Sequence, residues 1–154
     1  MTDEHYPFIR EAIALSKSAV ERGNEPFGAV LVKNGQVILR AENNIFTGHD
    51  PTGHAETNLV RLSVAKYEPE FLADCTLYTS TEPCVMCAGS IYWANIGRMV
   101  YACSEKRLSE IIGKPGGFDL PCTEVFARGL GHHIEVIGPV LEEEAAVIHL
   151  AYWK

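Results

Sequence analysis

LYTSTEPCVMCAG, residues 77–89, is the stretch of sequence that decides the fold. Its first part belongs to a β-branched and aromatic run over residues 75–80, which is typical of a buried strand. A Glu-Pro pair follows, and proline suits the first turn of a helix, so we expect a helix over residues 84–94. Cys84 and Cys87 then share one face of that helix in its first turn. Free N–H groups and the helix dipole favour thiolates there, so the pattern predicts a pair of metal-binding sulfurs.

A second segment, DPTGHAE at residues 50–56, supplies a third ligand. His54 stands at the start of another expected helix, which extends to about residue 67. Zinc favours imidazole and thiolate ligands, and a catalytic site uses three of them and leaves a fourth position open to water. We therefore predict that His54, Cys84 and Cys87 bind one Zn²⁺ per chain.

Glu56 lies two residues after His54, close to the expected metal but not needed as a ligand. A carboxylate in that place can take a proton from water and pass it to a ring nitrogen and to a departing amine. Zinc lowers the pKa of water from 15.7 to about 7. The combination of H-x-E with P-C-x-x-C is the signature of zinc-dependent base deaminases, which hydrolyse an amidine-like C–NH₂ bond.

Simpler interpretations of the same residues are a closed structural zinc site and a redox-active Cys-x-x-Cys pair. A structural site needs a fourth protein ligand at a usable spacing. A redox pair leaves His54 and Glu56 without a purpose. The catalytic zinc site is therefore the favoured interpretation.

The rest of the chain predicts one α/β domain over residues 1–154. Asn34-Gly35 between two β-branched runs indicates a tight hairpin, and later strands alternate with helices, which favours one mixed sheet between helices. The expected helices are 7–22, 54–67, 84–94, 105–112, 120–129 and 139–152, and the expected strands are 28–33, 36–42, 75–80, 98–102 and 133–137.

Bulk properties restrict the class of protein. No run approaches the ~18 to 20 apolar residues of a membrane helix, and the N-terminus lacks the pattern of a signal peptide, so a cytoplasmic protein is expected. The net charge of −7 disfavours general binding to nucleic acid. The cysteine count of five is odd and excludes complete disulfide pairing within the chain.

At these motifs the chain resembles the cytidine deaminase superfamily, in particular its guanine, cytosine and tRNA adenosine deaminases. The resemblance covers residues 7–103 well and the remainder loosely. It implies a three-layer α/β/α sandwich with a five-stranded mixed sheet, and a homodimer. It also implies that Asn43, eleven residues before His54, hydrogen-bonds the substrate. An asparagine that satisfies its own turn is the alternative.

The same resemblance suggests further substrate contacts, each with a structural alternative. Phe27 would wall the pocket or pack in the core, and Tyr152 and Trp153 would close over the base or anchor the last helix. Ala55 would contact the substrate beside the metal. Asp119, in the run GFDL, would assist proton transfer, although the acid that follows in guanine deaminases is missing.

These observations favour a hydrolytic deaminase of a small amino-heterocycle, such as guanine, cytosine, a related nucleoside or an amino-triazine. The alternatives are a tRNA adenosine-to-inosine deaminase and a non-catalytic zinc-containing binding module. The acidic charge and the run CSEKRL at residues 103–108 argue against the tRNA enzyme. The remaining histidines and cysteines are expected to be structural: His5, His49, His132, His133, His149, Cys75, Cys103 and Cys122.

Overall fold

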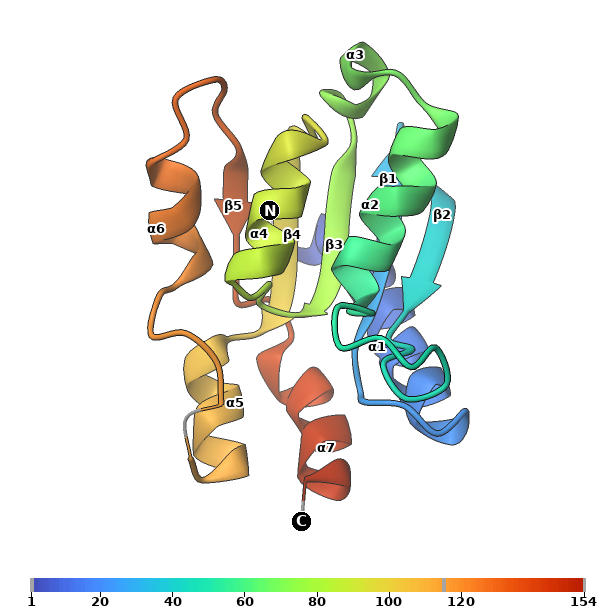
Figure 1. Cartoon of the computed structure of the whole chain (residues 1–154), viewed down its shortest axis with the longest axis vertical. Coiled ribbons are helices and arrows are strands. Elements are labelled where there is room, and N and C mark those ends of the chain that lie inside the picture. The colour runs from blue at the N-terminus through green and yellow to red at the C-terminus, as the bar shows by residue number, and fades with distance from the viewer. Residues whose placement is uncertain (1, 115, 154) are drawn as a thin grey trace.

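A computed structural model describes residues 2–114 and 116–153 of the chain. Its strands form a five-stranded mixed sheet in the order β2-β1-β3-β4-β5 (Figure 1). β1 runs antiparallel to both of its neighbours, whereas β3, β4 and β5 are parallel. The strands are β1 (Gly28–Lys33), β2 (Gln36–Glu42), β3 (Thr76–Thr81), β4 (Arg98–Cys103) and β5 (Glu135–Ile137).

Helices cover both faces of this sheet, which confirms the expected sandwich. α2, α4 and α6 lie side by side in front of the sheet in Figure 1, and α1 lies behind it. The helical elements are η1 (Thr2–His5), α1 (Tyr6–Glu21), α2 (Ala55–Lys66), α3 (Pro69–Leu72), α4 (Val85–Trp93), α5 (Glu105–Ile112), α6 (Cys122–Ala127) and α7 (Glu142–Tyr152).

The alternation of side chains along each strand builds two hydrophobic cores. Leu31 and Leu77 face the core beneath α2 and α4, whereas their neighbours Val30 and Tyr78 face the core beneath α1. The central strands are buried on both faces, so β1 and β4 read as nearly continuous apolar runs, whereas β3 also buries threonine and serine side chains. This burial makes the middle of the sheet a rigid support for the loops at its ends.

Local differences from the sequence prediction lie at short elements and helix starts. The sequence did not predict η1 or α3, because neither is long enough to show periodicity. α7 begins at Glu142 rather than at residue 139, because Leu141 takes a left-handed conformation with φ 54° just before it. Of the loop predicted around residues 114–117, Pro115 lies outside the described residues.

The antiparallel placement of β1 gathers distant segments at one edge of the sheet. Gly28 at the start of β1 pairs with Glu42 at the end of β2. The Asn43 N–H donates to the Phe27 carbonyl (3.0 Å). The end of β3 reaches the same edge, where the Gly28 N–H donates to Ser80 Oγ (3.0 Å). Residues just outside β1, β2 and β3 therefore meet.

We expect Gly28→Ala to destabilise the fold, because a Cβ at this position would meet the Ala12 carbonyl oxygen and approach Leu15 Cβ to 2.5 Å. Overpacking of this kind costs about 1–3 kcal/mol. Gly89→Ala in α4 is the matched control, since a Cβ there meets nothing within 4 Å. Urea unfolding should show a lower free energy of unfolding for Gly28→Ala only, and equal stabilities of the two variants would contradict this packing.

Candidate metal centre and active site

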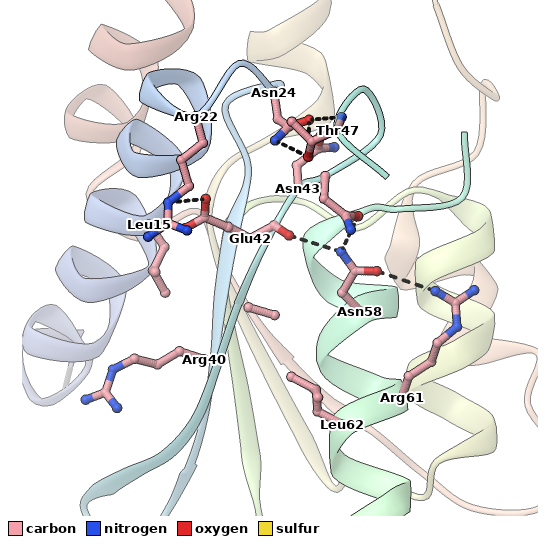
Figure 2. A pocket seen from close by; sticks show the side chains of 12 residues that line it. Leu15, Arg22, Asn24, Arg40, Glu42, Asn43, Thr47, Asn58, Arg61 and Leu62 are labelled. Atoms are coloured by element: carbon pink, nitrogen blue, oxygen red, sulfur yellow. Dashed lines mark hydrogen bonds and ion pairs between the residues drawn. The ribbon is translucent and has the colours of Figure 1, made fainter. Parts of the chain in front are cut away.

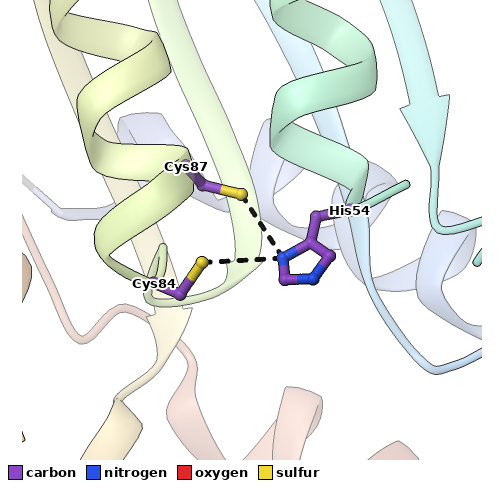
Figure 3. Close-up of side chains that lie close together, drawn as sticks. All are labelled: His54, Cys84 and Cys87. Carbon is purple, nitrogen blue, oxygen red and sulfur yellow. Dashed lines mark hydrogen bonds between the residues drawn. The ribbon is translucent and has the colours of Figure 1, made fainter. Parts of the chain in front are cut away.

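Two helix N-termini bring three ligand atoms together. His54 and Cys84 are the N-cap residues of α2 and α4, and Cys87 lies in the first turn of α4. His54 Nδ1 lies 3.5 Å from Cys84 Sγ and 3.6 Å from Cys87 Sγ (Figure 3). The three atoms all lie within 4.8 Å of one another. The structure thus places the three predicted ligands around one point.

These separations fit zinc. Tetrahedral zinc, with Zn–S of about 2.3 Å and Zn–N of about 2.0–2.1 Å, separates a ligand nitrogen from a ligand sulfur by about 3.6 Å. The observed distances of 3.5 and 3.6 Å agree with that value. One imidazole and two sulfurs also form a donor set that zinc prefers, with a fourth position left for water or substrate.

The two thiols differ in how readily they ionise. The pKa of Cys84 is lowered to about 4, first by a hydrogen bond from the Cys87 thiol and also by His54 and the Cys87 backbone N–H. The pKa of Cys87 is raised by the hydrogen bond to Cys84 and by burial. Cys84 therefore supplies the first negative charge, and a divalent cation would favour ionisation of Cys87 as well.

A polar contact supports the buried ligand from behind. Thr57 Oγ1 lies 3.2 Å from Cys87 Sγ and 3.4 Å from Ser90 Oγ. The Ser90 hydroxyl in turn donates to the Cys87 carbonyl (2.8 Å). Such contacts behind a ligand fix its orientation toward the metal.

Glu56 lies in the first turn of α2 and is 4% exposed. The pKa of Glu56 is raised to about 7, first by burial and then by the negative charge of Cys84, although a hydrogen bond with Thr79 opposes this shift. The carboxyl group lines the same pocket as His54 and Cys84. It is thus placed to hold or release a proton beside the metal site.

The pocket around these residues has a volume of about 320 Å³. Its walls come from every segment that meets at this edge of the sheet, together with α5 and the C-terminus. Its lining includes Glu25, Phe27, Asn43, His54, Glu56, Thr81, Glu82, Cys84, Glu105, Lys114 and Trp153. Most of the predicted site residues are therefore close together.

Asn43 has one side of its amide committed to the fold. Its Oδ1 accepts from the backbone N–H of Glu25 (3.3 Å) and from that of Ile45 (3.1 Å). Both partners are donors, so the oxygen must face them. The asparagine therefore satisfies its own turn, as one interpretation predicted, and it also lines the pocket.

Comparison with known proteins agrees with this geometry. The family model described as the cytidine and deoxycytidylate deaminase zinc-binding region matches residues 2–103. The chain belongs to this family. It is therefore a zinc-dependent hydrolase that acts on C–N bonds, and His54, Cys84 and Cys87 are positioned to hold the zinc.

Relatives within the family differ in substrate. The chain is 39% identical to a probable cytosine deaminase of Schizosaccharomyces pombe, over 99% of this chain and 94% of that protein. It is 41% identical to a guanine deaminase of Bacillus subtilis, over 75% and 71% of the two chains. A structure from work on A-to-I editing by tRNA:A34 deaminases superposes with a TM-score of 0.75 at 32% identity, covering 93% of this chain and 99% of the other.

The C-terminus of this deaminase is fixed against the pocket by a buried histidine. Trp153 Nε1–H donates to His149 Nδ1 (3.0 Å), so the proton of His149 is on Nε2, which donates to Thr81 Oγ1 (2.7 Å). The Phe27 ring meets the His149 ring edge-on at 5.3 Å. Trp153 and Phe27 thus both line the pocket from within one chain.

Three predicted substrate contacts lie elsewhere. Asp119 is exposed on the segment between α5 and α6 and lines a neighbouring hollow. Tyr152 packs its ring on Trp153 (4.7 Å between centroids) and does not line the pocket. The Ala55 side chain is buried in the core beneath α2. Of the aromatic pair, the structure therefore brings only Trp153 to the pocket.

Glu82 was not singled out by the sequence, yet it joins two helices to the metal-binding turn. Its Oε1 accepts from the Glu105 N–H (3.0 Å) at the start of α5. Its Oε2 accepts from the Cys122 N–H (2.9 Å) at the start of α6. One carboxylate thus supports both N-termini, where free N–H groups and the helix dipole favour a negative charge.

The remaining cysteines and two of the histidines have structural surroundings. Cys75, Cys103 and Cys122 are buried and free, as predicted. His5 hydrogen-bonds the Tyr78 hydroxyl (2.7 Å), and the His132 ring stacks on Tyr92 at 4.5 Å. The partners of His149 could not be predicted from the sequence, because Thr81 and Phe27 are distant from it along the chain.

We expect Cys87→Ala to lose zinc, since two ligands hold this metal far more weakly than three. Metal analysis of the purified variant should find well under one zinc per chain. Cys75→Ala is the matched control, because Cys75 is also buried and free but lies outside the ligand cluster. A full complement of zinc in Cys87→Ala would remove it from the ligand set.

We also expect His149 to make the fold sensitive to acid. Burial lowers its folded-state pKa from 6.5 to about 4, so the unfolded chain binds this proton more tightly. Its contribution to stability is complete above about pH 6.5 and is lost as pH falls toward 4, by about 2–3 kcal/mol at pH 4.5. His149→Gln keeps a donor and an acceptor without titrating. Urea unfolding at about pH 7 and pH 4.5 should therefore show a smaller acid loss in this variant, and equal losses would contradict the assignment.

Proposed function

We propose that the protein deaminates a small free nucleobase such as cytosine or guanine, releasing ammonia; a related nucleoside or an amino-triazine falls within the same proposal. The observation that carries it is the placement of the buried Glu56 carboxyl beside the His54, Cys84 and Cys87 cluster at one pocket. A purely structural zinc site has no use for a buried carboxyl group that opens into a cavity.

Glu56 would carry the protons of the reaction. When bound, zinc supplies Lewis acidity that lowers the pKa of water. The Glu56 carboxylate would take a proton from a water molecule in the pocket and give it to the ring nitrogen beside the amine-bearing carbon. The water oxygen bonds to this carbon, the C–N bond breaks, and Glu56 delivers the second water proton to the departing amine. Ammonia is thus released and a carbonyl remains.

The size and charge of the pocket favour a small ligand without phosphate. A volume of about 320 Å³ is at the lower end of the range for small-molecule sites. Four glutamates line the pocket: Glu25, Glu56, Glu82 and Glu105. Among the described residues of this lining, Lys114 is the only lysine or arginine. A nucleotide would bring its phosphate toward these carboxylates, so the lining disfavours it. The similarity to a probable cytosine deaminase over nearly the whole chain supports a free base.

Editing of tRNA is less well supported. A second groove of about 880 Å³ lies between α1, β2 and α2 and contains three arginines (Figure 2). Two of them are paired with acids, Arg22 with Glu42 (3.6 Å) and Arg40 with Glu11. Figure 2 shows the third, Arg61, turned toward Asn58. Such paired charges offer little to a phosphate backbone, although a solved tRNA:A34 deaminase structure shares the fold.

A non-catalytic binding module is also less well supported. Such a protein has no need for a proton carrier, yet Glu56 is present and buried beside the ligand cluster. The hydrogen bond with Thr79 holds its carboxyl group in place. The chain retains both the three metal ligands and the proton carrier Glu56, which favours catalytic turnover over binding alone.

A homodimer and a cytoplasmic location belong to the same proposal. Trp93 at the end of α4 is 84% exposed and Leu62 on α2 is 47% exposed, which favours an interface on this helical layer. The five cysteines are free, which suits a reducing compartment. Within residues 2–114 and 116–153, the helices are too short or too polar to cross a bilayer.

We expect the zinc-loaded protein to release ammonia from cytosine or guanine, and Glu56→Ala to lose about 10²–10⁴-fold in kcat while it keeps zinc and fold. Ammonia release should be measured against free bases, their nucleosides, amino-triazines and an unmodified tRNA anticodon stem-loop. Undiminished turnover in Glu56→Ala would remove this residue from the mechanism.

The remaining outcomes of this panel separate the alternatives. Turnover of the stem-loop with none of the small molecules would favour the tRNA enzyme. If the zinc-loaded, folded protein releases no ammonia from any of these substrates, the non-catalytic binding module would be favoured.

A further inference from the structure

Glu25 lines the pocket that contains the metal ligand His54. It lies two residues before Phe27, at the entry to β1, and is half-buried. It lines the same pocket as Glu56 and His54, and the charge of the His54 imidazole acts on it. Glu25 is thus part of the substrate cavity, although neither zinc binding nor proton transfer requires it.

The backbone on both sides fixes the position of this residue. The Glu25 N–H donates to Asn43 Oδ1 (3.3 Å), and the Glu25 carbonyl accepts from the Phe27 N–H (2.9 Å). Because Oδ1 is occupied, Asn43 offers its NH₂ group to the pocket. Glu25 lines the same pocket and offers carboxylate oxygens to it. This part of the pocket therefore presents one donor and one acceptor.

Among the described residues, Glu25 differs from the other acids of the pocket because its carboxylate has no hydrogen-bond donor. Both oxygens of Glu82 accept backbone N–H groups, Glu105 accepts from Ser109 (3.4 Å), and Glu56 is hydrogen-bonded with Thr79. Within the part of the chain that the structure describes, the Glu25 carboxylate makes no ion pair and no side-chain hydrogen bond. Burial raises the pKa of Glu25, which reflects a charge that is only partly hydrated.

A carboxylate in this condition is stabilised by a ligand that donates to it. When the amine-bearing carbon of cytosine lies at the metal and Glu56, the opposite side of the ring carries a carbonyl oxygen and a ring N–H. The carbonyl matches the Asn43 NH₂ group, and the N–H matches Glu25. In a nucleoside the sugar replaces that hydrogen, and the donor is lost.

We propose that Glu25 is a specificity-determining residue, which accepts a hydrogen bond from the ring N–H of a free base and thereby selects the base over its N-substituted and nucleoside forms. This inference rests on the proposed function and narrows it to unsubstituted heterocycles with a carbonyl beside the N–H. The Asn43 NH₂ group would donate to the ring carbonyl. The Glu25 carboxylate would accept from the neighbouring ring nitrogen only when that nitrogen carries a hydrogen.

The test compares Glu25→Leu and Glu25→Gln with wild-type protein, all zinc-loaded, on cytosine and on 1-methylcytosine, in which a methyl group replaces the ring N–H beside the carbonyl. We expect Glu25→Leu to lower kcat/KM about 10- to 100-fold on the base that is turned over, the value of a hydrogen bond to a charged group. The methylated partner should change less than about threefold. Glu25→Gln still accepts through its amide oxygen, so its loss should be intermediate, and it serves if Glu25→Leu does not fold.

Glu70→Leu is the control for the loss of a negative charge, because Glu70 is an exposed acid on α3, remote from the pocket lining. It should leave both activities unchanged. Equal losses on a base and its methylated partner in the Glu25 variants would overturn the inference and leave the proposed function intact.

Binding to Glu56→Ala, measured by calorimetry, separates the two proposals if wild-type protein does not turn over cytosine. Binding of cytosine that weakens in the Glu25→Leu double variant, with no such change for 1-methylcytosine, would support Glu25 without turnover. Failure of Glu56→Ala to bind cytosine would overturn the inference about Glu25, and the absence of turnover of every base, nucleoside and amino-triazine would overturn the proposed function.

Discussion

The N-termini of α2 and α4 must stay within the span of one metal ion, and much of the fold serves this requirement. His54 and Cys84 cap the two helices, and their ligand atoms lie 3.5 Å apart. The helices pack on each other and on the centre of the sheet, where Leu31 and Leu77 are fully buried. Their dipoles and free N–H groups then point at the same place, which favours thiolate and negative charge there. A small shift of either helix would separate the ligands, so the core determines the metal geometry as much as the ligands do.

The pocket depends on the direction of one strand. Because β1 is antiparallel to both β2 and β3, the residues before β1, after β2 and after β3 meet at one edge. Glu25, Asn43 and Thr81 enter the pocket in this way, each from a different segment. Reaction and recognition are thus assigned to different parts of the chain. The helix starts hold the metal and the proton carrier, and the loops around β1 contact the rest of the ligand.

Much of this could be predicted from the sequence, because the decisive signals are local. The spacing of His54, Glu56, Cys84 and Cys87 placed them on two helix starts, and the Asn34-Gly35 turn fixed the first hairpin. The residues that form the pocket wall were harder to predict, since their positions depend on contacts between segments that are distant along the chain. Trp153 enters the pocket and Tyr152 does not, because His149 bonds the indole and also Thr81. Asp119 matched a motif, but the motif does not specify which way its loop turns. Glu25 belongs to no motif and became informative only once its lack of a protein donor was visible.

The Glu82 carboxylate has a consequence for how such an enzyme can diverge. It holds the first N–H of α5 and the first N–H of α6, so the stretch that consists of α5 and the segment after it is anchored at both ends to the metal-binding turn. The stretch from Gly113 to Pro121 is exposed over most of its described length and lies outside the ligand cluster. Insertions, deletions or replacements in this stretch can therefore accumulate without disturbing zinc. Part of the pocket wall can therefore change in sequence and length while the metal ligands and Glu56 stay in place. Natural or engineered variation there can alter substrate choice and keep the same reaction.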